Sequence, residues 1–178
     1  METTLILKDK RLSYFGIVMI TSMIYEVAWV RMFTLNFGIT VYVSSVVIAA
    51  FMGGISIGAY TATLLKTDSS KLFRNLQVIL GVYSFILLLS YKYIFSLILV
   101  FVLLLVPTSI IGASYFLINK ILLKQNKEIG IIYAVDTICA GAGALIAGFI
   151  MLPILGIQMT VIITVALNLL ISIIWGKD

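Results

Sequence analysis

Long apolar stretches separated by short polar segments run through the whole sequence. Six of them are long enough to cross a bilayer, because a span needs about 20 apolar residues at a rise of about 1.5 Å each. We expect transmembrane helices over Leu12–Leu35, Val41–Leu65, Phe73–Tyr91, Tyr93–Ile118, Ile129–Leu152 and Ile154–Trp175. The pattern therefore predicts an all-α polytopic membrane protein in which residues 1–178 form a single domain of six transmembrane helices.

Lys and Arg fall almost entirely on one side of these expected helices. That side carries ten of the twelve: Lys8, Lys10, Arg11, Lys66, Lys71, Arg74, Lys120, Lys124, Lys127 and Lys177. The opposite side carries Lys92, and Arg31 lies within or at the end of the first helix. Because cytoplasmic connections are enriched in Lys and Arg, we expect both termini on the cytoplasmic face of the cell membrane.

Composition supports the same class of protein. Hydrophobic residues make up 62% of the chain and charged residues 11%, with a mean hydropathy of +1.21, whereas a soluble domain carries about 25% charged residues. The net charge of +5 lies in short connections, so the expected partner is the lipid bilayer and its anionic surface rather than nucleic acid. No hydrophilic stretch is long enough for a soluble catalytic domain, and no enzyme activity is expected on this chain.

Metal and cofactor chemistry is not expected either. The sequence has no histidine, the commonest general base and transition-metal ligand. Its single cysteine, Cys139, stands among Ile138, Ala140 and Gly141 and is interpreted as a small packing residue. We therefore expect no cofactor.

The six expected helices divide into two triplets, each with a glycine-rich middle helix. Three is an odd number of spans, so the second triplet would be inverted relative to the first, as in many transporters. Gly54 and Gly58 in one triplet, and Gly141 and Gly148 in the other, would allow close helix packing; the alternative is a glycine-lined passage or a sliding interface between the halves. Pro107 is expected to kink the fourth helix, either as an ordinary kink or as a hinge beside a polar site.

Three ionisable residues are expected inside the membrane: Glu26, Arg31 and Asp136. Asp or Arg at the centre of a spanning helix costs roughly 2.5–3.5 kcal/mol on insertion scales, so such residues usually have a partner or a function. Glu26 would lie near the midplane, and Arg31 is about 140° further around the same helix, too far for a good pair. The two alternatives are a structural polar cluster and a midplane site for a cation or proton.

Several blocks of sequence resemble the membrane region of the spermidine-synthase-like integral membrane proteins, which is itself similar to half of a major-facilitator transporter. The blocks occur in order along nearly the whole chain: Tyr25–Arg31, Phe37–Tyr42, Ala50–Gly58, Pro107–Ala113, Gly130–Phe149 and Leu152–Gly156. In that family a soluble aminopropyltransferase-like domain usually follows; this sequence ends at Asp178 without it, so the resemblance implies no catalytic residues here. The resemblance also implies Asn where this chain has Asp136.

Two functional hypotheses follow. In the first, the chain is transporter-like, pairs with itself or with a second membrane subunit, and moves a small cation such as a polyamine, with Glu26 as counter-ion, Asp136 as an inner relay and Pro107 as a hinge. In the second, it is a non-catalytic membrane subunit that anchors or feeds a separate, soluble synthase-like enzyme docked on the cytoplasmic loops. The sequence slightly favours the first, because two triplets and a buried carboxylate suit a translocation site.

Overall fold

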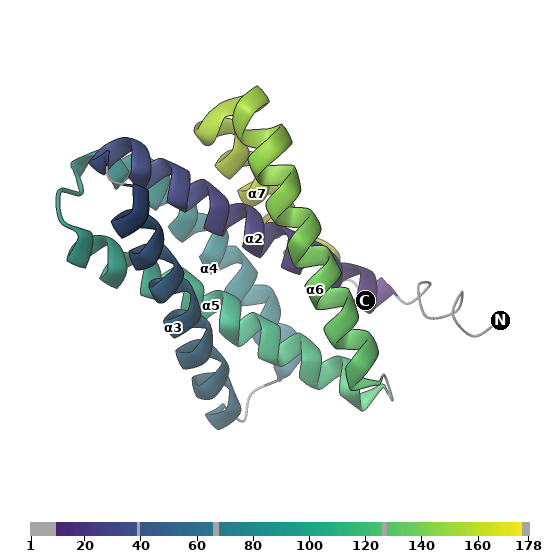
Figure 1. Ribbon diagram of the computed structural model, residues 1–178. Coiled ribbons are helices and arrows are strands. Elements are labelled where there is room, and N and C mark those ends of the chain that lie inside the picture. Colours follow the sequence, from purple (N-terminus) through teal and green to yellow (C-terminus); the bar gives the residue numbers. More distant parts are fainter. Residues whose placement is uncertain (1–9, 39, 66–67, 126–127, 176–178) are drawn as a thin grey trace.

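The structure, a computed structural model, describes residues 10–38, 40–65, 68–125 and 128–175 (Figure 1). Within these ranges the chain is helical almost throughout and contains no strand, which confirms the all-α prediction. The elements are α2 (Lys10–Phe37), α3 (Thr40–Leu64), α4 (Ser69–Ser90), the 3₁₀ turn η1 (Tyr91–Tyr93), α5 (Leu97–Lys124), α6 (Ile129–Leu145), the π-helical segment η2 (Ile146–Met151) and α7 (Leu152–Trp175).

Local signals end and begin these helices. Gly38 has a φ of +70°, and its N–H donates to the carbonyl of Thr34 at 2.8 Å, so the left-handed glycine terminates α2. At the start of α4, the Asp68 carboxylate accepts a hydrogen bond of 3.0 Å from the N–H of Ser70. Asp68 therefore satisfies one of the N–H groups that a helix start leaves unpaired.

Five helices in the described part of the chain are long and apolar enough to cross a membrane, not the six that the sequence predicted. The last of them, Ile129–Trp175, is 47 residues long and contains both the fifth and the sixth predicted helices. α6, η2 and α7 follow one another without a gap, so the helix does not end at Pro153. The backbone instead leaves helical geometry at Gly156, where φ is +73° and ψ is 174°.

Helix contacts show the direction in which the chain runs. α6 meets α2 in the same order along both helices, at Gly16 with Cys139 and at Ile20 with Gly143. α7 meets α2 in the opposite order, at Tyr14 with Trp175 and at Tyr25 with Asn168. The chain therefore reverses direction between α6 and α7, and the turn is visible where the green and yellow-green segments meet (Figure 1).

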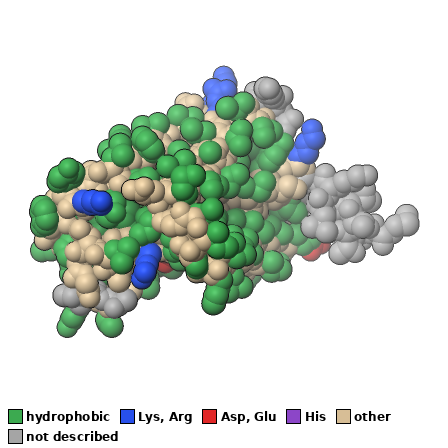
Figure 2. Space-filling view, turned by 90° about the horizontal axis from the view of Figure 1, so that it is seen from above, with side chains coloured by type: hydrophobic (Ala, Val, Ile, Leu, Met, Phe, Trp, Pro, Cys, Tyr) green, Lys and Arg blue, Asp and Glu red, His purple; other side chains and the backbone are tan. Residues whose placement is uncertain are grey.

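The helix α2 lies at the centre of the bundle, packed against α6 and α7 and also contacting α3 and α5. Its buried face is rich in aromatic residues, among them Tyr25 and Trp29, whose rings stack with centroids 5.3 Å apart. The outward faces of the surrounding helices expose large aliphatic side chains, and hydrophobic side chains cover most of the face shown in Figure 2. Such a surface is compatible with a lipid environment.

One end of the bundle collects the basic residues. The start of α4 meets the end of α7 there, where Trp175 Nε1 donates to Ser70 Oγ at 2.7 Å. The described Lys and Arg residues of this basic end are Lys10, Arg11, Lys71, Arg74, Lys120 and Lys124. Lys8, Lys66, Lys127 and Lys177, which the sequence also assigned to this side, lie outside the described residues.

Candidate functional site

Glu26 lies near the middle of α2, with 9% of its surface exposed. Among the described residues, no ion pair or hydrogen bond engages its carboxylate. Burying an ionised carboxylate without a partner is among the most costly arrangements in a protein interior. The buried carboxylate is therefore the strongest candidate for a functional group in the described chain.

Arg31 does not lie beside Glu26. Its side chain is exposed and lines a pocket of about 550 Å³ near the turn between α6 and α7, together with Gly148 and Gly156. Arg31 is five positions after Glu26, which corresponds to a rise of about 7.5 Å along α2. The two charges occupy different surroundings, and no ion pair joins them in the described part of the chain.

Asp136 lies on α6, half-buried against α5. Its carboxylate faces the Tyr115 hydroxyl, and the Asn119 side chain also interacts with Tyr115. Because Cys139 lies beside Gly16, Asp136 stands level with the first residues of α2, about 20 Å along the bundle from Glu26. The three ionisable residues singled out from the sequence therefore do not form one site: Asp136 lies towards the basic end, Glu26 in the middle and Arg31 beyond it.

Pro107 is buried inside α5, which continues without interruption from Leu97 to Lys124. The proline has no N–H, so it leaves the carbonyl of Leu103, four residues earlier, without its helical donor. The hydroxyl of Tyr83 in α4 donates to this carbonyl at 2.9 Å. The hydroxyl oxygen of Thr108 lies 3.0 Å from the carbonyl oxygen of Ala50 in α3. The turn of α5 around Pro107 is therefore bonded to both neighbouring helices.

The predicted glycines divide into two groups. A Cβ at Gly54 would overlap the Thr108 hydroxyl, and one at Gly58 would overlap the Ser109 carbonyl, so α3 and α5 touch backbone to backbone. Gly141 and Gly148 are exposed, with no atom of another element within 4 Å of an added Cβ. The glycine of α6 that makes a close contact is Gly143, where an added Cβ would lie 2.6 Å from the Ile20 carbonyl oxygen.

A buried polar group connects α2 and α7 in the interior. Asn168 Nδ2 donates to the Tyr25 hydroxyl at 3.1 Å, a hydrogen bond between the two helices. The side chain of Ser84 in α4 also faces Tyr25. Gln77 in α4 is fully buried, with neither amide atom bonded to another described residue.

Sequence analysis missed Gln77 and Ser84. Each is a polar residue inside an apolar stretch, and their spacing of seven positions places both on one face of the helix. This pattern could have identified them.

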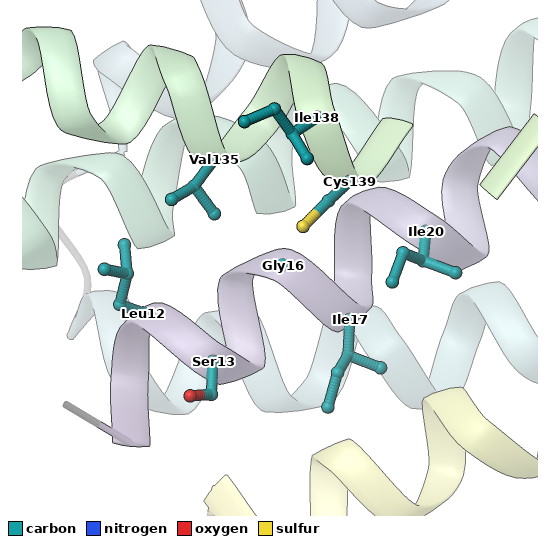
Figure 3. Close-up of a pocket in the computed structure, with 8 residues that line it drawn as sticks. All are labelled: Leu12, Ser13, Gly16, Ile17, Ile20, Val135, Ile138 and Cys139. Carbon is teal, nitrogen blue, oxygen red and sulfur yellow. The ribbon is translucent and has the colours of Figure 1, made fainter. Parts of the chain in front are cut away.

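The pocket drawn in Figure 3 has a different character. It measures about 310 Å³ and lies between α2 and α6, lined mainly by aliphatic side chains such as Leu12, Ile17 and Ile138 (Figure 3). Ser13 and Cys139 also line it, and the Cys139 thiol packs against Gly16. No charged side chain lines it, so the pocket suits an apolar chain rather than a charged solute.

Comparison with protein-family models, with curated proteins and with solved structures finds no match to this chain.

Proposed function

We propose that this chain is a multi-pass membrane protein that crosses the bilayer six times. The five apolar helices suit such an environment, and the break at Gly156 would divide the last of them into two antiparallel passes. A continuous run of 47 residues would extend about 70 Å, more than twice the hydrocarbon thickness of about 30 Å. The basic end would face the cytoplasm, with both termini on that side.

The pattern of helix contacts supports two inverted repeats of three helices. In such a repeat, exchanging the two triplets replaces α2 with α5, α3 with α6 and α4 with α7. Under this exchange the contact between α3 and α5 becomes the contact between α6 and α2, and the contact between α4 and α7 is unchanged. The glycine contacts follow the same exchange: Gly58 of α3 packs on α5, and Gly143 of α6 packs on α2. Inverted repeats of this kind are a common architecture of transporters.

The transported solute would be a small cation such as a polyamine. The observation that carries this proposal is the buried carboxylate of Glu26 at the middle of the central helix, with which no other described residue pairs. A cationic solute would offset its charge during passage, and intramembrane carboxylates commonly mark ion or proton pathways. Asp136, nearer the basic end, would serve as the inner relay, with Pro107 as a hinge. The resemblance to the membrane region of spermidine-synthase-like proteins favours polyamines among such cations.

A second copy of the chain would complete the pathway. The exposed faces of α3 and α6 carry small and hydroxyl residues in addition to aliphatic ones, namely Ser45, Ala49 and Ser56 on α3 and Ala134, Thr137 and Gly141 on α6. The exposed faces of α4 and α7 are mainly large and aliphatic. Because small residues allow helices to approach closely in lipid, α3 and α6 are the faces on which a second copy would pack.

The test is uptake of radiolabelled spermidine and putrescine into proteoliposomes. Glu26→Gln removes the buried charge while keeping the size of the side chain, and uptake is expected to fall to the level of empty liposomes. Glu128→Gln is the matched control, because Glu128 is an exposed carboxylate at the start of α6, and its uptake should equal that of the unmodified protein. Equal uptake by Glu26→Gln and the unmodified protein would remove Glu26 from the mechanism.

The basic end supports a second candidate function, a membrane subunit that anchors or feeds a separate soluble enzyme. Its Lys and Arg side chains form a surface to which an acidic soluble partner would be attracted. This role predicts a neighbouring gene for a synthase-like soluble protein, and co-purification of the two products that weakens as salt rises. Robust uptake by the chain alone argues against this alternative.

A further inference from the structure

A polar pocket opens at the basic end between α2, α4 and α5. It measures about 480 Å³ and is lined by Arg11 from α2, by the segment Asp68–Ser70 at the start of α4, and by Lys120 and Lys124 from α5. Among the described residues, three cationic side chains from two helices therefore share this pocket with one carboxylate. That carboxylate, Asp68, is engaged with the N–H of Ser70 as the cap of α4.

The charge distribution in this pocket favours an anion. Lys120 and Lys124 are four residues apart on one helix, an arrangement in which like charges repel. The N-terminus of α4 adds the partial positive charge of a helix start. Arg11 is held at the pocket by the indole of Trp175, whose ring centroid lies 5.7 Å from the guanidinium carbon. A phosphate group offsets these charges and accepts hydrogen bonds from several donors at once.

An apolar groove adjoins this pocket. It measures about 540 Å³ and is lined by Phe116, Asn119 and Leu123, together with the same Lys120 and Lys124. Phe116 is one turn of α5 further from the basic end than Lys120, so the groove leads away from the polar pocket along the apolar part of the helix. The two lysines thus separate a polar compartment from an apolar one.

We propose that this pair of compartments binds an anionic phospholipid, with the headgroup phosphate among Arg11, Lys120 and Lys124 and an acyl chain along Phe116 and Leu123. Basic pockets at the cytoplasmic ends of membrane helices are suited to anionic headgroups. The apolar groove favours a lipid over free phosphate, because inorganic phosphate has nothing to place there. The inference needs the chain to lie in a membrane, but it does not need the chain to transport a solute.

The test is native mass spectrometry of the detergent-solubilised full chain, titrated with dioleoyl phosphatidylglycerol. The double substitution Lys120→Gln and Lys124→Gln is expected to weaken binding about thirtyfold, since each basic side chain near an anionic lipid surface contributes roughly a fivefold factor. Lys71→Gln is the matched control: Lys71 lies at the same end of the bundle but lines neither compartment, and affinity should be unchanged. Lys120→Arg with Lys124→Arg keeps the charge and should retain most of the affinity.

Three results would overturn the proposal. Equal loss of binding in Lys71→Gln would show general surface attraction rather than a built pocket. Displacement of the lipid by equimolar inorganic phosphate would assign the pocket to a free anion. Equal affinity for dioleoyl phosphatidylcholine would show that headgroup charge does not matter. Retained affinity in the Arg pair excludes misfolding as the cause of a loss in the Gln pair.

Discussion

The close crossing of α3 and α5 can be tested by adding a single methyl group. In Gly58→Ala the new Cβ would overlap the backbone carbonyl of Ser109 and would lie 2.9 Å from the N atom of Ala113. Backbone atoms cannot rotate out of the way as a side chain can, so the two helices must move apart. Overpacking of this kind costs about 1–3 kcal/mol.

The neighbouring glycine provides a matched control. A Cβ at Gly53 would meet Leu105 Cδ2 at 3.7 Å, an ordinary contact. Both substitutions replace glycine by alanine in the interior of α3, so both gain up to about 1 kcal/mol of helix propensity. Their difference therefore isolates the overpacking cost, and Gly58→Ala should be less stable than Gly53→Ala by about 1–3 kcal/mol.

The assay is unfolding in mixed detergent micelles at increasing mole fractions of dodecyl sulfate, followed by circular dichroism for both variants and the unmodified protein. Gly53→Ala should unfold at the same mole fraction as the unmodified protein or at a higher one, and Gly58→Ala at a lower one. Equal midpoints for the two variants would refute the backbone contact between α3 and α5.

Three further predictions concern the interior bonds and the exposed face of α6. Tyr83→Phe should lower stability by about 1 kcal/mol, because it removes the hydroxyl that donates to the Leu103 carbonyl, which Pro107 leaves without a helical donor. In a Pro107→Ala background this carbonyl regains its helical donor. Tyr83→Phe should therefore cost less stability in that background, as measured in a double-mutant cycle. Tyr25→Phe should destabilise the protein by about 0.6–1.7 kcal/mol, since it removes the acceptor of the hydrogen bond from Asn168. Because this bond is then already absent, adding Asn168→Ala should lower the stability little further through its loss. Gly141→Leu should leave the monomer as stable as before, because no other element of the described chain lies within 4 Å of an added Cβ there, and should shift the protein from dimer to monomer in light scattering if α6 is a pairing face.

The helices could be predicted because an apolar stretch in lipid has few alternatives: every backbone N–H and C=O must be bonded within the segment. Their ends were harder to place. The fourth predicted helix stopped at Ile118, where the apolar run ends, but α5 continues to Lys124. Asn, Lys and Leu residues are compatible with a helix beyond the membrane, so the apolar pattern marks the limit of the span rather than of the helix.

The break within the last apolar helix, Ile129–Trp175, was also misplaced. The predicted boundary fell at Pro153, between the helices expected to end at Leu152 and to begin at Ile154, but the chain stays helical through η2 and the start of α7. Gly156, three residues later, makes the break because it adopts a positive φ, which glycine does at no steric cost. Sequence alone does not say which of the two residues breaks the run, because both are compatible with helix and with turn.

The candidate site was predictable residue by residue but not as an assembly. Glu26 stood out as a carboxylate in the middle of an apolar stretch, and it is buried near the middle of α2. The separation of Arg31 and Asp136 from it depends on how α6 lies along α2, which no local pattern specifies. Gln77 escaped notice for the opposite reason, since an uncharged amide in a spanning helix carries a weaker signal than a charge.

The most direct test of transport through Glu26 is solute counterflow, because the gradient of unlabelled solute drives exchange and no ion gradient is needed. Proteoliposomes loaded with millimolar unlabelled spermidine are diluted into trace labelled spermidine, with the unmodified protein, Glu26→Gln and Glu128→Gln compared at equal protein content. A transient overshoot of label with the unmodified protein and Glu128→Gln, absent with Glu26→Gln, is the predicted result. An overshoot of equal size with all three, or none with the well-folded unmodified protein, would contradict transport of spermidine by this chain through Glu26.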